Sequence, residues 1–158
     1  MMEPSFGKLL VLLVDANVDF VLVGGLAVSL QGYVRFTEDV DLLVDASPEN
    51  VTRLLNTLET YGEGCSRELS SQDFTVEEGA VRVVEEVEQC QMDLFTMISG
   101  RIFSDVIKDA DTFQLQGRDI RYASKSSLIE WKEKSVREKD RLDVMALRRL
   151  SADPAAFD

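Results

Sequence analysis

A short apolar strand that runs directly into two glycines is the feature that most constrains the fold of this chain. Residues 19–23 place apolar side chains on both faces, which is typical of a buried strand. Gly24 and Gly25 follow at once, and residues 26–30 are predicted to form a short helix. Glycine lets a ligand approach the backbone and a helix start offers free N–H donors, so the turn suits a phosphate. Taken alone, a Gly-Gly turn is more often purely structural.

The remaining chain alternates helices with strands, which predicts a single α/β (α+β) domain with a mixed sheet covered by helices. Predicted helices cover 5–17, 47–62, 102–109 and 124–150. Predicted strands cover 39–44 and 91–96, and hairpins are predicted over 74–84 and 112–122. We divide the domain into a core, 1–123, and a C-terminal helical segment, 124–150, that packs on this core.

The 158-residue composition excludes several kinds of chemistry. The chain has no histidine, which rules out a Ser-His-Asp triad, a Cys-His pair and histidine-ligated metals. Its two cysteines, Cys65 and Cys90, form no disulfide framework and suit a reducing cytosol. No apolar run approaches the roughly 20 residues of a membrane helix, and no signal peptide is recognisable. We therefore expect a cytoplasmic protein with no membrane partner, whose chemistry rests on carboxylates, Lys, Arg or Tyr.

The charge of the chain is acidic and uneven. The net charge is −12, with 18 acidic against 5 basic residues in 1–100 and 11 against 12 in 101–158. An acidic surface repels a nucleic-acid backbone, so a long duplex partner is not expected, although the C-terminal part could meet phosphate locally. The simplest reading of the bulk charge is solubility.

Two carboxylates occur two residues apart in the predicted strand 39–44. Strand alternation places Asp39 and Asp41 on one face, about 6.5–7 Å apart along the strand. Like charges so close repel each other and lose solvation when buried, and Mg²⁺ would relieve both problems through its preference for carboxylate oxygens. The plain alternative is an exposed strand face with two solvated acids.

A third carboxylate, Asp93, lies in the apolar strand 91–96. If that strand lies beside the Asp39 strand, three carboxylates converge, which is enough to hold two metal ions for phosphoryl or nucleotidyl transfer. The third acid could also accept the proton of an attacking hydroxyl. Alternatively, Asp93 is only an acid on an edge strand.

These residues resemble the DNA polymerase beta-type nucleotidyltransferase superfamily. More narrowly, they resemble its small bacterial members related to abortive-infection and toxin–antitoxin proteins. The match combines Gly24-Gly25-x-Ala27 with R-x-T-x-D-x-D over residues 35–41 and the later acid at position 93. A C-terminal helix with a lysine followed by R-x-K-D-x-x-D, over residues 128–143, belongs to the same pattern.

The resemblance implies the nucleotidyltransferase fold and the transfer of a nucleoside monophosphate from an NTP to a hydroxyl. Gly24 and Gly25 would contact the triphosphate, while Asp39, Asp41 and Asp93 would bind Mg²⁺ or Mn²⁺, with Asp93 as general base. The acceptor is open among a protein, a tRNA or other RNA end and a small molecule. A toxin-like role with an antitoxin-like partner protein is also implied. A catalytically inactive module that senses a nucleotide or binds a partner is the rival reading.

Several basic residues are candidates for the triphosphate, which keeps excess negative charge even with Mg²⁺ bound. Lys132 and Lys139 are seven residues apart and share a helix face, and Arg35 and Arg137 are further candidates. The alternative for the C-terminal residues is a solvated helix with ordinary ion pairs. One departure from the superfamily is Leu26, because many members have Ser or Thr directly after the glycines.

Overall fold

The computed structural model describes residues 4–31, 39–62, 64, 69–87, 90–133 and 144–149. The helices are α1 (Pro4–Asp15), α2 (Gly24–Leu30), α3 (Pro48–Glu59), α4 (Phe103–Val106) and α5 (Lys125–Glu133), with 3-10 turns η1 (Ser71–Phe74) and η2 (Ile107–Asp109). The strands are β1 (Phe20–Val23), β2 (Asp39–Val44), β3 (Ala80–Glu85), β4 (Cys90–Phe95), β5 (Asp111–Leu115) and β6 (Arg118–Tyr122). Residues 144–149 are also helical.

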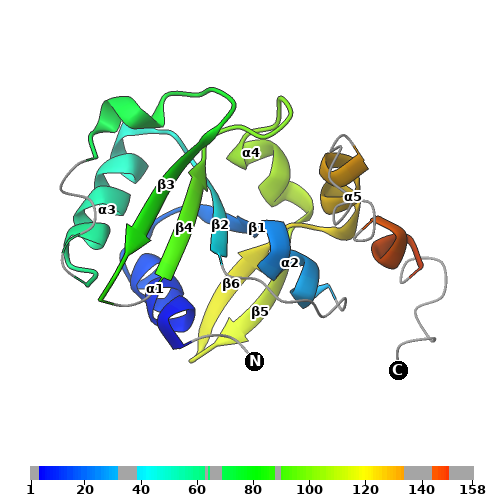
Figure 1. The fold of residues 1–158 in the computed structure, drawn as a ribbon, viewed down its shortest axis with the longest axis horizontal. Helices are drawn as coiled ribbons and strands as arrows, with labels where there is room; N and C mark the ends of the chain where they lie inside the picture. The colour runs from blue at the N-terminus through cyan, green and yellow to red at the C-terminus, as the bar shows by residue number, and fades with distance from the viewer. Residues whose placement is uncertain are drawn as a thin grey trace.

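The strands form one mixed sheet in the order β3-β4-β2-β1-β6-β5 (Figure 1). Strand β2 is parallel to β4 and β1 is parallel to β6, whereas the other neighbouring pairs are antiparallel. The predicted mixed sheet covered by helices is therefore confirmed. Every residue of β1 is buried, as its apolar sequence predicts for a strand with neighbours on both sides.

The hydrophobic core joins the sheet to helices α1, α2 and α3, with one residue each from α4 and α5. Leucines of α1 and the apolar stripe of α3 join one buried cluster with strand residues from across the sheet. Among the strand residues, Val81, Leu94, Leu42 and Leu22 are consecutive cross-strand neighbours, so their side chains line the same face. Within the described ranges, no helix is long and apolar enough to cross a membrane.

Helix α3 begins where its sequence predicts. Pro48 occupies the first turn, and the Ser47 hydroxyl accepts a hydrogen bond from the Asn50 backbone N–H at 3.3 Å. The fully buried Asn50 side chain then links the helix to two loop segments. Its Oδ1 accepts from the Asp19 N–H at 2.7 Å, and its Nδ2 donates to the carbonyls of Asp19 and Asp45 at 3.0 and 2.8 Å. This residue therefore fixes the end of β2 against the start of β1.

One predicted hairpin is wrong and the other is confirmed. Residues 112–115 and 118–122 pair as β5 and β6, but β3 pairs antiparallel with β4 instead of with residues 74–77. A capping box between Ser70 and Asp73 folds residues 71–74 into a 3-10 turn. The Thr96 hydroxyl, just past β4, donates to the Thr75 carbonyl at 2.6 Å, which ties the following residues to the end of β4. The predicted helix over 102–109 is divided into α4 and η2.

Candidate active site

Three carboxylates lie on the face of the sheet opposite the apolar row. Strands β2 and β4 are parallel neighbours, and in their register Asp41 lies directly beside Asp93. Asp39 is two residues before Asp41, and alternate residues of a strand point to the same face. The side chains of Asp39, Asp41 and Asp93 therefore share this face. Asp93 is buried, with 8% of its surface exposed.

The first glycine of the predicted turn lies against one of these carboxylates. Val23, the last residue of β1, is the cross-strand partner of Asp41, so the chain leaves β1 beside this aspartate. Gly24 follows with φ +68°, and a Cβ added to it would lie 1.9 Å from Oδ2 of Asp41. A side chain at position 24 would therefore be strained and would collide with the Asp41 carboxylate. Gly25 is buried in the first turn of α2, where its carbonyl accepts a hydrogen bond from the Ser29 hydroxyl at 3.2 Å.

An arginine that the sequence analysis missed completes the row. Arg82 of β3 is the cross-strand partner of Asp93, and its guanidinium donates twice to the carboxylate. The Nε–Oδ1 distance is 2.9 Å and the Nη2–Oδ2 distance is 3.0 Å. The row across the sheet is thus Arg82, Asp93, Asp41 and Val23. The sequence analysis predicted that β3 pairs with residues 74–77. Arg82 lies opposite Asp93 only because β3 pairs with β4, so the incorrect pairing could not reveal this contact.

The guanidinium of Arg82 also interacts electrostatically with Asp39 and Asp41. Its Nη2 lies 3.7 Å from Oδ2 of Asp39. The hydrogen bonds from Arg82 to Asp93 raise the pKa of the arginine most, and the negative charges of Asp93, Asp39 and Asp41 raise it further. Arg82 is therefore a cationic partner of this acidic group.

The chemistry of these three carboxylate side chains fits a divalent cation. Carboxylate oxygens are the ligands that Mg²⁺ and Mn²⁺ prefer, and Asp39, Asp41 and Asp93 supply them from two adjacent strands. In the part of the chain that the structure describes, no three acidic or thiol side chains are grouped closely enough to hold a metal ion. A metal bound here would therefore require the carboxylates to draw together.

The predicted basic residues fall largely outside the described ranges. Arg35, Arg137 and Lys139 lie outside them, and for Lys132 only the backbone in α5 is described. Helix α5 itself contacts α2, and its Leu128 belongs to the buried cluster. Helix α5 thus packs against α2, the helix that begins at the glycine turn, and the roles of the four basic side chains stay predictions.

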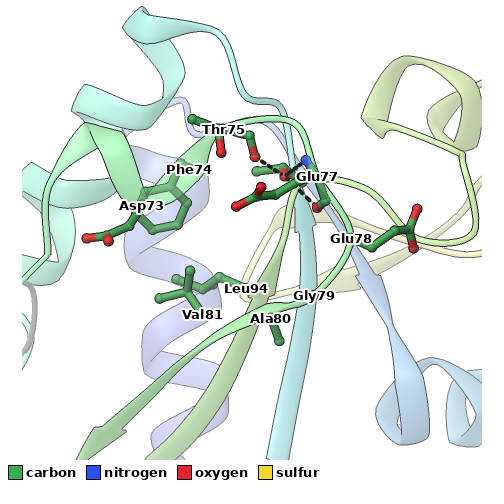
Figure 2. Close-up of a pocket in the computed structure, with 10 residues that line it drawn as sticks. Asp73, Phe74, Thr75, Glu77, Glu78, Gly79, Ala80, Val81 and Leu94 are labelled. Carbon is green, nitrogen blue, oxygen red and sulfur yellow. Dashed lines mark hydrogen bonds between the residues drawn. The ribbon is translucent and has the colours of Figure 1, made fainter.

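A cavity of about 110 Å³ opens on the other face of the sheet. Figure 2 shows Val81 and Leu94 pointing from β3 and β4 towards Phe74 of η1 in this cavity. Leu94 directly follows Asp93, and successive strand residues point to opposite faces. This cavity is therefore separate from the site formed by Asp39, Asp41 and Asp93.

A comparison with protein families decides the family of this chain. Residues 8–148 match the family described as "Nucleotidyltransferase of unknown function (DUF6036)". The chain belongs to this nucleotidyltransferase family. The match spans the glycine turn, the three aspartates and Arg82. No match to a curated protein was found.

Solved nucleotidyltransferase structures share the fold across nearly the whole chain. The lincosamide antibiotic adenylyltransferase LnuA, in its lincomycin-bound form, is 19% identical with a TM-score of 0.62, covering 94% of this chain and 97% of LnuA. An antigenic nucleotidyltransferase-like protein from Paracoccidioides brasiliensis is 17% identical with a TM-score of 0.57, covering 94% and 76%. ANT(2″)-Ia in complex with adenylyl-2″-tobramycin is 13% identical with a TM-score of 0.51, covering 96% and 94%. At these identities the likeness shows the fold alone.

Proposed function

We propose that this protein is a Mg²⁺-dependent nucleotidyltransferase that moves a nucleoside monophosphate from an NTP to a hydroxyl. The observation that carries the proposal is the row in which Asp93 lies beside Asp41 on one face of the sheet, with Gly24 against Asp41. Membership of a nucleotidyltransferase family supports the same activity. The narrower toxin-like role and the antitoxin-like partner stay predictions from the sequence resemblance.

Asp39, Asp41 and Asp93 would hold the divalent cation. When bound, the cation supplies positive charge that neutralises the triphosphate and stabilises the charge that develops during transfer. Gly24 leaves the space beside Asp41 clear of a side chain, so a phosphate could approach the backbone of the turn. Gly25 would contact the same phosphate. The candidates for binding the remaining negative charge of the triphosphate are Lys132, Arg35, Arg137 and Lys139.

The reaction needs one proton acceptor, and Asp93 is the proposed one. The acceptor oxygen forms a bond to the α-phosphorus, the bond from this phosphorus to the oxygen bridging the β-phosphate breaks, and pyrophosphate leaves with the electron pair. The hydroxyl proton passes to the Asp93 carboxylate. Each Asp93 oxygen has two lone pairs, so one lone pair stays available for the proton whether the other is used by Arg82 or by the cation.

A small-molecule hydroxyl is the acceptor that the observations favour. LnuA is matched over 97% of its length, so a domain of this size suffices for an adenylyltransferase whose structure contains a bound antibiotic. Residues 1–100 contain 18 acidic and 5 basic residues, and this negative charge would repel the phosphates of an extended RNA segment. RNA ends and protein side chains are the other outcomes of the experiment below.

The proposal is tested by incubating the protein with each α-labelled NTP, Mg²⁺ and a cell extract divided into small-molecule, RNA and protein fractions. We expect label in the small-molecule fraction, and we expect it to disappear with Asp41→Asn. Label in the RNA or protein fraction would overturn the proposed acceptor and keep the transferase activity. No label in any fraction would contradict the transferase activity itself.

One observation favours the rival, a catalytically inactive module that binds a nucleotide. Arg82 pairs with the carboxylates, and the described residues contain no three-ligand metal group. The rival predicts NTP binding without transfer of label from any of the four NTPs. Equilibrium binding of a labelled NTP, measured alongside the transfer assay, separates the two functions.

A further inference from the structure

Arg82 makes a two-bond pair with the aspartate that the proposed reaction needs. The guanidinium contacts both oxygens of Asp93 at 2.9 and 3.0 Å, the forked geometry that fixes a carboxylate most firmly. The Asp93 side chain is 12% exposed, whereas that of Arg82 is 60% exposed. The aspartate is therefore held in place by a partner that reaches it from the solvent side.

The same guanidinium also lies near a second carboxylate, that of Asp39 in β2. Its Nη2 is 3.7 Å from Oδ2 of Asp39. Residues 1–100 contain 18 acidic and only 5 basic side chains, and Arg82 is one of the latter. Carboxylates on neighbouring strand positions repel each other, and a cation between them relieves the repulsion. Arg82 supplies this relief when no metal is bound.

A divalent cation held by Asp39 and Asp93 would approach the same carboxylates that Arg82 contacts. The divalent cation and the Arg82 guanidinium would also repel each other at such short range. Arg82 lies on β3, which is an edge strand of the described sheet, and its long side chain can turn into solvent without disturbing the buried cluster. Metal binding and the Arg82 pair thus oppose each other.

We propose that Arg82 is the built-in counter-ion of the metal site. It holds Asp39 and Asp93 in the metal-free protein and competes with the divalent cation for them. This inference rests on the proposed function, because it takes the carboxylates as the metal ligands. Arg82 is a positioning residue, since it acts through the aspartates that it pairs with.

The test is calorimetric titration of the full-length protein with Mn²⁺. Removing the positive charge with Arg82→Gln is expected to lower the dissociation constant for Mn²⁺ by about ten-fold, because the competing cation is gone. Arg82→Lys keeps a positive charge and is expected to stay within about three-fold of the wild type. Arg82→Met, which keeps an apolar stem, replaces Arg82→Gln if the latter does not fold.

Arg118 provides the matched control. It makes a similar two-bond pair with Asp15, at 2.9 Å for both contacts, at the opposite end of the sheet from Gly24. Arg118→Gln is expected to leave the Mn²⁺ dissociation constant unchanged. A tightening equal to that of Arg82→Gln would mean that net charge, and not the local pair, sets the affinity, and would overturn the inference.

The failure of this inference is distinct from the failure of the proposed function. If the wild type binds Mn²⁺, Asp41→Asn abolishes the binding, and Arg82→Gln leaves the affinity unchanged or weaker, only the counter-ion role is wrong. If neither the wild type nor Arg82→Gln binds Mn²⁺ at millimolar concentration, the metal-dependent function is wrong, and the counter-ion role falls with it.

Discussion

Gly24 and Asp41 are in contact across two strands, and the contact depends on glycine. A Cβ at position 24 would lie 1.9 Å from Oδ2, 2.7 Å from Cγ and 2.9 Å from Cβ of Asp41. The whole aspartate side chain would have to move to admit a methyl group. The glycine of the turn and the aspartate of the D-x-D pattern, 17 positions apart in the sequence, therefore form one structural unit.

Gly24→Ala tests this contact. The φ of +68° costs alanine about 1–2 kcal/mol, and the added methyl group displaces the Asp41 carboxylate. We expect transfer activity to fall by at least about 100-fold, since misplacing a catalytic group by about 1 Å has an effect of that size. Gly117→Ala is the control, because Gly117 has φ +80° and nothing within 4 Å of an added Cβ. Equal losses of activity in both variants would contradict the special role of Gly24.

Asp41→Asn is expected to remove the stabilisation of the protein by Mg²⁺. At a Mg²⁺ concentration ten times the dissociation constant, binding stabilises the folded protein by about 1.4 kcal/mol. For a chain of this size that corresponds to a rise in Tm of about 3–6 °C. Thermal unfolding with and without Mg²⁺ measures the rise, and the exposed Asp119, changed to Asn, removes the same charge from β6 as a control. An undiminished rise in Asp41→Asn would argue against Asp41 as a ligand.

Asn50→Ala is expected to destabilise the fold without touching the site. The change leaves the Asp19 N–H and the carbonyls of Asp19 and Asp45 without their buried partner. An unsatisfied buried polar group costs about 1–3 kcal/mol, so we expect a loss of about 2–4 kcal/mol in the free energy of unfolding. Urea unfolding measures it. Asn56→Ala, at an exposed position of the same helix, is expected to change it by less than about 0.5 kcal/mol.

The Asp15–Arg118 pair predicts a pH dependence of stability. The hydrogen bonds from Arg118 lower the pKa of Asp15 below its ordinary value of 3.8. A carboxylate with a lowered pKa in the folded state contributes stability above its unfolded pKa and loses it as the pH falls through the folded one. The difference in Tm between the wild type and Arg118→Gln should therefore be constant near neutral pH and shrink below pH 3.8. A difference that persists or grows in acid would contradict this.

Much of the fold could be predicted because local patterns dominate it. The buried strand before Gly24, the start of α3 at Ser47 and Pro48, and the hairpin of β5 and β6 each follow from neighbouring residues. The partner of β3 could not be predicted in this way. Strand β3 pairs with β4, and alternation in a strand says nothing about which neighbour it will have.

The same limit applies to the candidate site. Asp39 and Asp41 share a face by strand alternation alone, which the sequence is enough to predict. Asp93 joins the other two carboxylates only if β4 lies next to β2. The sequence alone could not establish that these two strands are neighbours. Arg82 was missed because its significance comes entirely from the β3–β4 register. Arg35, Arg137 and Lys139, outside the described residues, stay predictions.

The most direct test of the account is the anomalous scattering of Mn²⁺ in crystals soaked with this ion and a non-hydrolysable NTP analogue. We predict an anomalous peak within about 2.2 Å of carboxylate oxygens of Asp39 and Asp41, beside Asp93, with the triphosphate of the analogue reaching the same ion. A well-ordered nucleotide bound elsewhere, with no Mn²⁺ peak at these carboxylates, would contradict the account.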